Sequence, residues 1–177
     1  MNRRTRKMWL WIVLVPVVLV ALAFVVGSLL PERYSAEKSV EIDLPIDEVW
    51  RRLHDPKRFP MSGNMCRGVE ELPSENGLAV WEERMGGSAL RVRNVAESEP
   101  SHLHRELVDT VVPFRSDCEF WIEPSGDGTR VRCRNDVALR SGTWHVPLFR
   151  ISMSLFGGAG AAIDSYLGGI GSDRGSR

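Results

Sequence analysis

The sequence is poor in cysteine and lacks the common catalytic motifs. Its 3 cysteines, Cys66, Cys118 and Cys133, are an odd number without the spacing of a metal site. We expect free, buried thiols; an exported domain could oxidise two of them, and the sequence leaves this redox state open. Gly-x-Ser-x-Gly, phosphate-binding and dinucleotide-binding patterns are also missing. We therefore expect no cofactor and no metal, and no nucleophile with its base can be assigned.

An excess of positive charge is also lacking. The chain has 23 basic and 23 acidic residues. Four of the basic residues and none of the acidic ones lie in the first 30 positions, so the rest of the chain is acidic by four charges. Domains that bind nucleic acids are normally basic. We therefore expect no nucleic-acid partner.

A long apolar segment lies near the N-terminus. Residues 9–30 contain no charged side chain, and about 20 such residues allow a helix to cross the roughly 30 Å hydrocarbon layer of a membrane. Pro16 lies inside the segment, where membrane helices tolerate it. By the positive-inside rule, a basic tail at residues 1–8 keeps the N-terminus cytoplasmic; its charges are Arg3, Arg4, Arg6 and Lys7. We expect a single-pass cell-membrane protein whose C-terminal domain is exported and whose residues 9–30 contact the lipid bilayer.

A cleaved signal peptide is the alternative interpretation, because it also begins with a basic region and an apolar core. Such a core has about 7–15 residues, and the segment here is longer. The small-x-small tripeptide Ala21-Leu22-Ala23 is followed by further apolar residues. The length therefore favours an uncleaved anchor.

The remainder divides into a linker at residues 31–36, one domain at residues 37–170 and a flexible tail at residues 171–177. Alternation of apolar and polar residues predicts seven strands, and the short turns between them predict antiparallel pairing. A helix is expected between Pro45 and Asp55. The predicted strands lie near residues 35–43, 66–72, 78–85, 89–97, 102–112, 115–123 and 129–139.

The best-defined strand pair surrounds a turn at Gly126-Asp127. It places apolar residues opposite one another on one face and opposite charges, with a Trp–Arg contact, on the other. The expected pairs are Ile122–Val131, Phe120–Cys133, Glu123–Arg130, Trp121–Arg132 and Glu119–Arg134. We interpret the arginine stripe as a solvated outer face rather than as an anion-binding patch.

Apolar residues recur at spacings of three and four from Pro147 to Ile170, which predicts an amphipathic helix. Three glycines at positions 157, 158 and 160 disfavour helix and predict a break or bend near residue 158. The charge-free stretch from Ile151 to Ile163 is too short to cross a bilayer. We interpret this segment as a core helix.

Several segments carry a family resemblance: residues 39–42 (SVEI), 44–50 (LPIDEVW), 80–83 (VWEE), 126–131 (GDGTRV), 147–150 (PLFR) and 164–167 (DSYL). In this order they resemble the helix-grip domain of the polyketide cyclase/dehydrase and lipid-transport superfamily, also called SRPBCC or START-like. The resemblance implies an α+β fold in which a seven-stranded, curved antiparallel sheet surrounds a long C-terminal helix. It also implies an apolar cavity between the sheet and that helix.

Large apolar residues with a few polar anchors would suit such a cavity. The candidate lining residues are Trp81, Arg105, Phe114, Phe120, Trp144, His145, Met153 and Phe156, with Arg105 or His145 as the anchor. The alternative is that these side chains only fill a close-packed core.

Two further clusters are weaker candidates. His102, His104 and Glu106 share one strand face, but a zinc site needs more ligand-rich sequence than is present, and we expect an exposed outer face. Glu82 and Glu83 are adjacent in a strand and point to opposite faces. The sequence thus predicts a membrane-anchored domain that binds a hydrophobic small molecule or lipid near the bilayer. The alternatives are a ligand-free interaction domain and a cyclase- or dehydratase-type enzyme that uses His145, Arg105 or Glu82.

Overall fold

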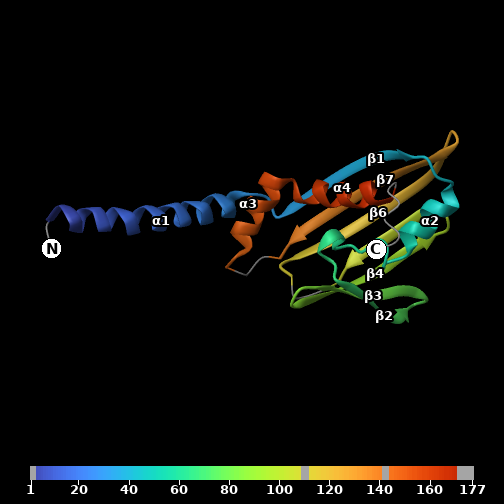
Figure 1. The fold of residues 1–177 in the computed structure, drawn as a ribbon, viewed down its shortest axis with the longest axis horizontal. Coiled ribbons are helices and arrows are strands. Elements are labelled where there is room, and N and C mark those ends of the chain that lie inside the picture. Colours follow the sequence, from blue (N-terminus) through green and yellow to red (C-terminus); the bar gives the residue numbers. More distant parts are fainter. Residues whose placement is uncertain (1–2, 109–111, 141–143, 171–177) are drawn as a thin grey trace.

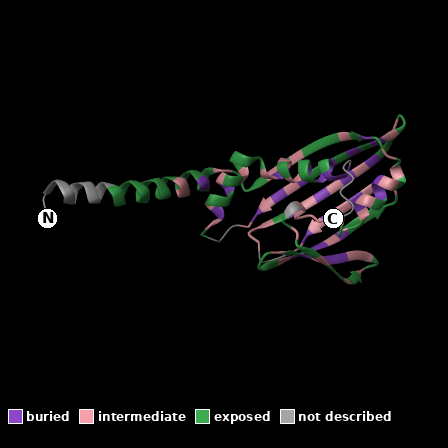
Figure 2. Cartoon of the chain, viewed as in Figure 1, coloured by how far each residue is buried: buried purple, intermediate pink, exposed green. Residues whose placement is uncertain are grey.

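The computed structural model describes residues 3–108, 112–140 and 144–170 (Figure 1). A helix, α1 (Arg3–Leu29), projects from a domain in which helices cover one face of a β-sheet. The predicted tail at residues 171–177 lies outside the described residues. Figure 2 shows α1 exposed over most of the part that is coloured by burial, while buried residues alternate along the strands.

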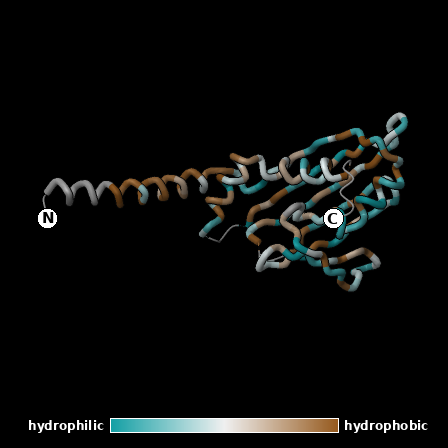
Figure 3. The backbone as a smooth tube through the Cα atoms, viewed as in Figure 1, coloured by the Kyte–Doolittle hydropathy of each residue, from teal (hydrophilic) through white to brown (hydrophobic). Residues whose placement is uncertain are grey.

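Helix α1 contains the predicted apolar segment and continues through Pro16. Its side chains from Ile12 to Leu22 are exposed, and among the described helices it is the one that is long and apolar enough by itself to cross a membrane. The bent C-terminal helix pair would count as a second only if its two halves were taken as a single span. Figure 3 shows the hydrophobic residues of α1 extending to the point where it meets the domain.

The seven strands form one antiparallel sheet with the order β1-β7-β6-β5-β4-β3-β2. The expected fold class is confirmed, and the strand ends differ from the predicted ones by a few residues. The strands are β1 (Arg33–Ile42), β2 (Gly68–Glu75), β3 (Leu78–Met85), β4 (Ser88–Ser98), β5 (His102–Leu107), β6 (Phe114–Ser125) and β7 (Gly128–Leu139). Because β1 already begins at Arg33, the predicted linker at residues 31–36 is wrong. Only residues 30–32 separate α1 from the sheet.

The predicted register of β6 and β7 is confirmed for all five residue pairs, and Arg132 lies 4.4 Å from the Trp121 ring centroid. The partners of the arginine stripe differ from the prediction. Arg130 pairs with Glu41, and the Arg132–Glu37 separation is 3.7 Å. Arg134 pairs with Asp136 of its own strand at 2.8 Å. Strand β7 lies between β6 and the edge strand β1. Strand β1 therefore supplies carboxylates that a prediction from β6 and β7 alone does not include.

Helices α2 (Ile46–His54) and α4 (Gly158–Ile170) cover the same face of the sheet, with the short helix η1 (Gly63–Met65) beside them. The core between them includes Val49, Leu53, Phe120, Ile163 and Ile170, all almost completely buried. A smaller cluster around Trp81, Leu90, Val92 and Leu107 fills the β3–β5 end of the domain. Two packed layers, sheet and helices, thus leave the outer sheet face to charged residues.

The C-terminal segment forms two helices rather than the single long helix that the fold resemblance implied. Helix α3 (Val146–Phe156) and α4 meet at a 55° bend. Gly157 at the bend has φ 58°, a left-handed conformation that glycine adopts readily and that ends a helix. The predicted break near residue 158 is therefore confirmed. The bend lets α4 pack on the sheet while α3 turns toward α1 (Figure 1).

Candidate functional site: an apolar cavity

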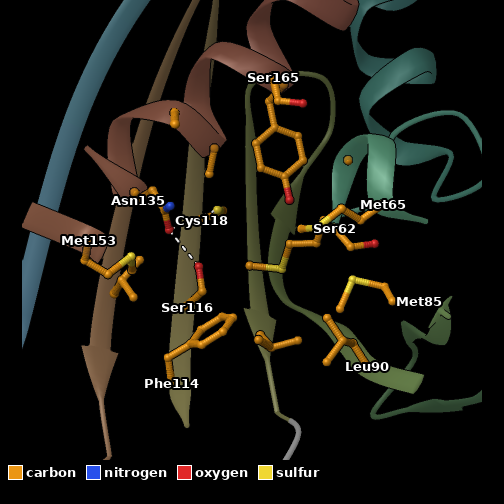
Figure 4. Close-up of a pocket in the computed structure, with 18 of the residues that line it drawn as sticks. Ser62, Met65, Met85, Leu90, Phe114, Ser116, Cys118, Asn135, Met153 and Ser165 are labelled. Atoms are coloured by element: carbon orange, nitrogen blue, oxygen red, sulfur yellow. Dashed lines mark hydrogen bonds between the residues drawn. The ribbon is translucent and has the colours of Figure 1, made fainter. Parts of the chain in front are cut away.

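A cavity of about 450 Å³ lies between the sheet and the two C-terminal helices, at the end of the sheet nearest α3 (Figure 4). Its walls come from the η1 segment, from the ends of β3 to β7 and from both helices. Met85, Leu90, Phe114 and Met153 are among the apolar lining residues. Small-molecule sites in proteins typically enclose about 300–1,000 Å³. The cavity therefore has the size and the character of a site for an apolar ligand.

A short polar network crosses the cavity wall at the base of α4. Ser116 Oγ donates a hydrogen bond to Asn135 Oδ1 at 2.8 Å, and the Cys118 thiol donates to the same oxygen at 3.3 Å. Asn135 Nδ2 in turn donates to the Ala159 carbonyl at 3.3 Å. Because these groups satisfy one another, their main effect is to hold the first turn of α4 against β6 and β7.

Tyr166 is different, because its hydroxyl has no hydrogen-bond partner among the described residues although it is buried. The side chain lines the cavity, and its ring packs edge-on against Phe120 with centroids 5.8 Å apart. Burial raises the pKa of Tyr166 well above its ordinary value, so the phenol stays protonated at neutral pH. It can donate or accept one hydrogen bond to a bound molecule.

The second ionisable group in the cavity wall is the Cys118 thiol. Burial raises its pKa to about 12, so the reactive thiolate is not populated at neutral pH. No Asp, Glu, His, Lys or Arg side chain lines the cavity within the described part of the chain. The wall thus offers neutral hydrogen-bonding groups and no base that works near pH 7.

The buried carboxylate of Glu83 fastens the wall formed by the η1 segment. It accepts hydrogen bonds from the Met61 and Ser62 backbone N–H groups at 2.6 and 2.7 Å. The Ser62 hydroxyl and the Trp81 indole N–H donate to it at 2.6 and 2.9 Å. With four donors, this carboxylate is satisfied inside the protein. Glu82 points to the opposite face, as predicted, and neither residue faces the cavity.

Arg105 was a predicted anchor for a ligand, but its guanidinium is hydrogen-bonded to protein groups. It donates to the carbonyls of Leu53 and Phe59 and to Asn94 Oδ1, and it lies 5.1 Å from the Trp81 ring centroid. Burial lowers the pKa of Arg105, while nearby Tyr166 and Glu83 oppose that change. Because Leu53 lies in the last turn of α2, the cation stabilises the C-terminus of that helix.

The eight predicted lining residues fall into three places. Phe114 and Met153 line the cavity. Trp81, Arg105 and Phe120 are buried in the core outside it. Trp144, His145 and Phe156 lie at the two ends of α3 outside the cavity lining, and the tryptophan and the phenylalanine are exposed. The reason is the bend at Gly157, which turns part of this segment away from the sheet.

Sequence reasoning missed Tyr166, Ser116 and Asn135. Ser116 shares the inward face of β6 with Cys118 and Phe120, so strand alternation carried a signal for it. Tyr166 follows the helical spacing of the core face of α4, where a phenol is indistinguishable by pattern from a packed aromatic. What distinguishes the two is that the buried Tyr166 hydroxyl has no hydrogen-bond partner among the described residues.

The histidine pair lies on the outer face. His102 Nε2 is 2.8 Å from Glu119, and His104 Nε2 is 3.5 Å from Asp117. Among the described residues, no cluster of three His, Cys, Asp or Glu side chains could hold a metal ion. Of the cysteines, Cys118 and Cys133 are buried as expected, whereas Cys66 is partly exposed; all three are free thiols.

The sequence matches no protein-family model and no curated protein. Solved structures do match. The aromatase/cyclase ZhuI from Streptomyces sp. R1128 superposes with a TM-score of 0.63 at 16% identity, covering 78% of this chain and 91% of that one. The di-domain ARO/CYC BexL from the BE-7585A biosynthetic pathway gives a TM-score of 0.56 at 15% identity over 83% of this chain. This chain spans about half of BexL, 52% of its length.

A further structure, of a protein from Thermus thermophilus, matches with a TM-score of 0.55 at 19% identity and covers 78% of this chain and 94% of that one. At such identities the likeness concerns the fold. It agrees with the seven-stranded antiparallel sheet and the C-terminal helices described above. The C-terminal domain of this chain therefore has the helix-grip fold that the sequence resemblance implied.

Proposed function

We propose that this protein is a membrane-anchored binding module that holds a hydrophobic small molecule or lipid in the cavity between its sheet and its C-terminal helices. The observation that carries the proposal is the cavity itself, about 450 Å³ and mostly apolar, with the unpartnered hydroxyl of Tyr166 buried in its wall. A ligand-free interaction domain would be expected to fill this space with side chains, because protein cores are close-packed.

The anchoring part of the proposal rests on α1. Its exposed apolar surface has no partner in the domain over residues 12–22, and its length suits a bilayer. The positive-inside rule favours export of the domain. Intact-mass measurement of the membrane fraction tests the anchor: the full chain has a mass of 19.9 kDa. A shorter, soluble chain would indicate a cleaved signal peptide instead.

Native mass spectrometry of the full chain, released from lipid nanodiscs, tests ligand binding. We expect an apolar adduct that Val137→Trp removes, because Val137 lines the cavity and the larger side chain would fill part of it. Ala138→Trp is the matched control, since its side chain lies on the opposite face of β7. An adduct that persists in Val137→Trp, or no adduct with any added lipid, would argue against the proposal.

A cyclase- or dehydratase-type enzyme is the second candidate, favoured by the aromatase/cyclase structures that share the fold. The described cavity wall supplies a protonated phenol in Tyr166 but no base at neutral pH. Binding without chemistry therefore fits the cavity better. Turnover of a cyclisable polyketide analogue that is lost in Tyr166→Phe would reverse this ranking.

A further inference from the structure

Helix α3 presents an apolar face that nothing in the described part of the chain covers. Leu155 and Phe156 are 72% and 75% exposed, and Leu148 and Phe149 are about 40% exposed. Trp144, directly before the helix, is 76% exposed. At 100° per residue these side chains of α3 lie on one side of the helix, where Ser152 is the one polar residue among them. A surface helix of a soluble domain would normally point such residues inward.

The charged residue of α3 points the other way. Arg150 is buried and donates to the carbonyls of Ser28 and Leu30 at the end of α1 at 3.0 and 3.3 Å, and it pairs with Glu32. These carbonyls belong to the last turn of α1 and the residue beyond it, where partners within a helix are missing. The only charge on α3 is thus neutralised against α1, which leaves the opposite face uncharged.

Close packing holds α3 in place against α1. A Cβ at Gly27 would clash with the Pro147 carbonyl oxygen, so the two backbones are in direct contact. Phe24 stacks on Trp144 with ring centroids 6.4 Å apart. The Tyr34 hydroxyl donates to the Arg150 carbonyl at 3.0 Å. Figure 1 shows α3 lying across the end of α1. The position of α1 in a membrane therefore determines the depth at which α3 lies along the membrane normal.

With α1 across the bilayer, this position of α3 along the membrane normal is the membrane interface. The apolar segment of α1 ends at Leu30, and Phe24 lies six residues earlier, about 9 Å deeper at 1.5 Å per residue. Trp144 stacks on Phe24 and would therefore lie within about 10 Å of the membrane boundary, near which tryptophan is enriched. Interfacial helices bury their apolar faces about 5–10 Å into this boundary.

We propose that α3 lies in the interface of the same bilayer that holds α1, with Leu148, Phe149, Leu155, Phe156 and Trp144 in contact with lipid. The inference rests on the proposed anchoring of α1. It deepens the proposed function, because Phe149 and Met153 of α3 also line the cavity. One wall of the ligand site then lies at the bilayer surface, and an apolar ligand meets acyl chains at the cavity rim beside Phe149.

Photo-crosslinking of the full chain in phosphatidylcholine/phosphatidylglycerol nanodiscs tests this contact. The photoreactive residue p-benzoyl-phenylalanine replaces Phe156 in one variant and Val18 of α1 in another. Val95 of β4 is the matched control, since it is an exposed apolar residue of the domain far from α3. All three positions are on the surface, where substitutions change stability little. We expect lipid adducts at positions 18 and 156, several-fold above the yield at position 95.

The other outcomes separate the two proposals. Lipid adducts at position 18 but not at 156 would overturn the inference and leave the anchor intact. Equal yields at 156 and 95, or crosslinks from 156 to a second protein chain, would also overturn it. Absence of adducts at position 18 would mean that α1 is not in the membrane, and both the anchor and the inference would fall.

Discussion

At the scale of single residues, the Tyr166 hydroxyl is the clearest pointer to a ligand. A buried hydroxyl without a partner costs about 1–3 kcal/mol, and the described protein groups around Tyr166 supply no partner. Ser116, Cys118 and Asn135 of the cavity wall are bonded to one another or to backbone. A bound molecule with one polar group would satisfy Tyr166 without disturbing that network.

Tyr166→Phe should therefore weaken ligand binding, and it should not lower the free energy of unfolding of the ligand-free protein, because it removes a buried hydroxyl that has no partner among the described residues. Loss of one neutral hydrogen bond corresponds to about 0.5–1.5 kcal/mol, or roughly 2- to 12-fold in the dissociation constant. Titration of the full chain with a fluorescent fatty acid, together with urea unfolding, measures both quantities. Tyr34→Phe is the control, because that hydroxyl bonds to Arg150 and Ser154 outside the cavity. Equal affinities for Tyr166→Phe and the unchanged protein would contradict the assigned role.

The three thiols should differ in reactivity. Burial raises the pKa of Cys118 to about 12 and raises that of Cys133 as well, so both remain protonated in the folded protein at neutral pH. Cys66 is partly exposed. When the native protein is treated with a disulfide reagent at about pH 7.5, about one thiol per chain should react rapidly. The other two thiols should react only after unfolding. Cys66→Ser should abolish the fast phase; a fast phase that survives would show that a β-sheet thiol is accessible.

At the scale of elements, the bend at Gly157 divides the C-terminal segment into a helix that packs on the sheet and one that packs on α1. Helix α4 buries Ile163, Tyr166 and Ile170 against the sheet. Helix α3 buries little except Val146 and Arg150. The stability of α3 therefore depends on its contact with α1 more than on the core of the domain.

Replacing Arg150 by methionine should release α3 from α1. The substitution leaves the carbonyls of Ser28 and Leu30 without their donor and Glu32 without its ion pair, a local loss of about 2–4 kcal/mol. Hydrogen exchange of the full chain in nanodiscs should become faster over residues 146–156 and stay unchanged in β6 and β7. Arg134→Met is the control, because its ion pair with Asp136 is exposed. Unchanged exchange in α3 would show that the packing of Gly27 and Phe24 alone holds it.

At the scale of the whole molecule, the domain is joined to its helix rigidly rather than by a tether. Residues 30–32 connect α1 to β1, and α3 packs against α1. The start of β6 and the end of β7 contribute to the cavity wall, and Figure 1 shows this end of the sheet nearest to α1. A domain held in this orientation would meet its ligand at the membrane surface and not by swinging into solution.

Removal of residues 1–29 should expose both the α1-facing and the lipid-facing sides of α3. We expect the truncated chain to self-associate in the absence of detergent, because contiguous exposed apolar patches drive association. Sedimentation at several concentrations would detect species larger than a monomer. Leu155→Glu with Phe156→Glu on the truncated chain should restore the monomer. A truncated chain that stays monomeric without these substitutions would show that the apolar face of α3 is too small to drive self-association.

Local sequence determined the elements of this protein. Period-two alternation set the seven strands and the register of β6 and β7, and the turn glycines set where they reverse, because these features depend on neighbours in the chain. The apolar segment at residues 9–30 and the break near residue 158 follow from composition in the same way. The fold resemblance depended on the order of these local signals, and the solved structures agree with it.

Tertiary structure decided which residues face the cavity and which face the outside. Trp144 was assigned to the cavity as a large aromatic, but its partner is Phe24, far earlier in the chain. Arg105 was assigned as a ligand anchor, but the carbonyls that surround it come from α2 and the loop after it. Periodicity identifies the face of an element and not what that face meets. The contact of α3 with α1, and with it the proposed membrane face, depends on such long-range packing.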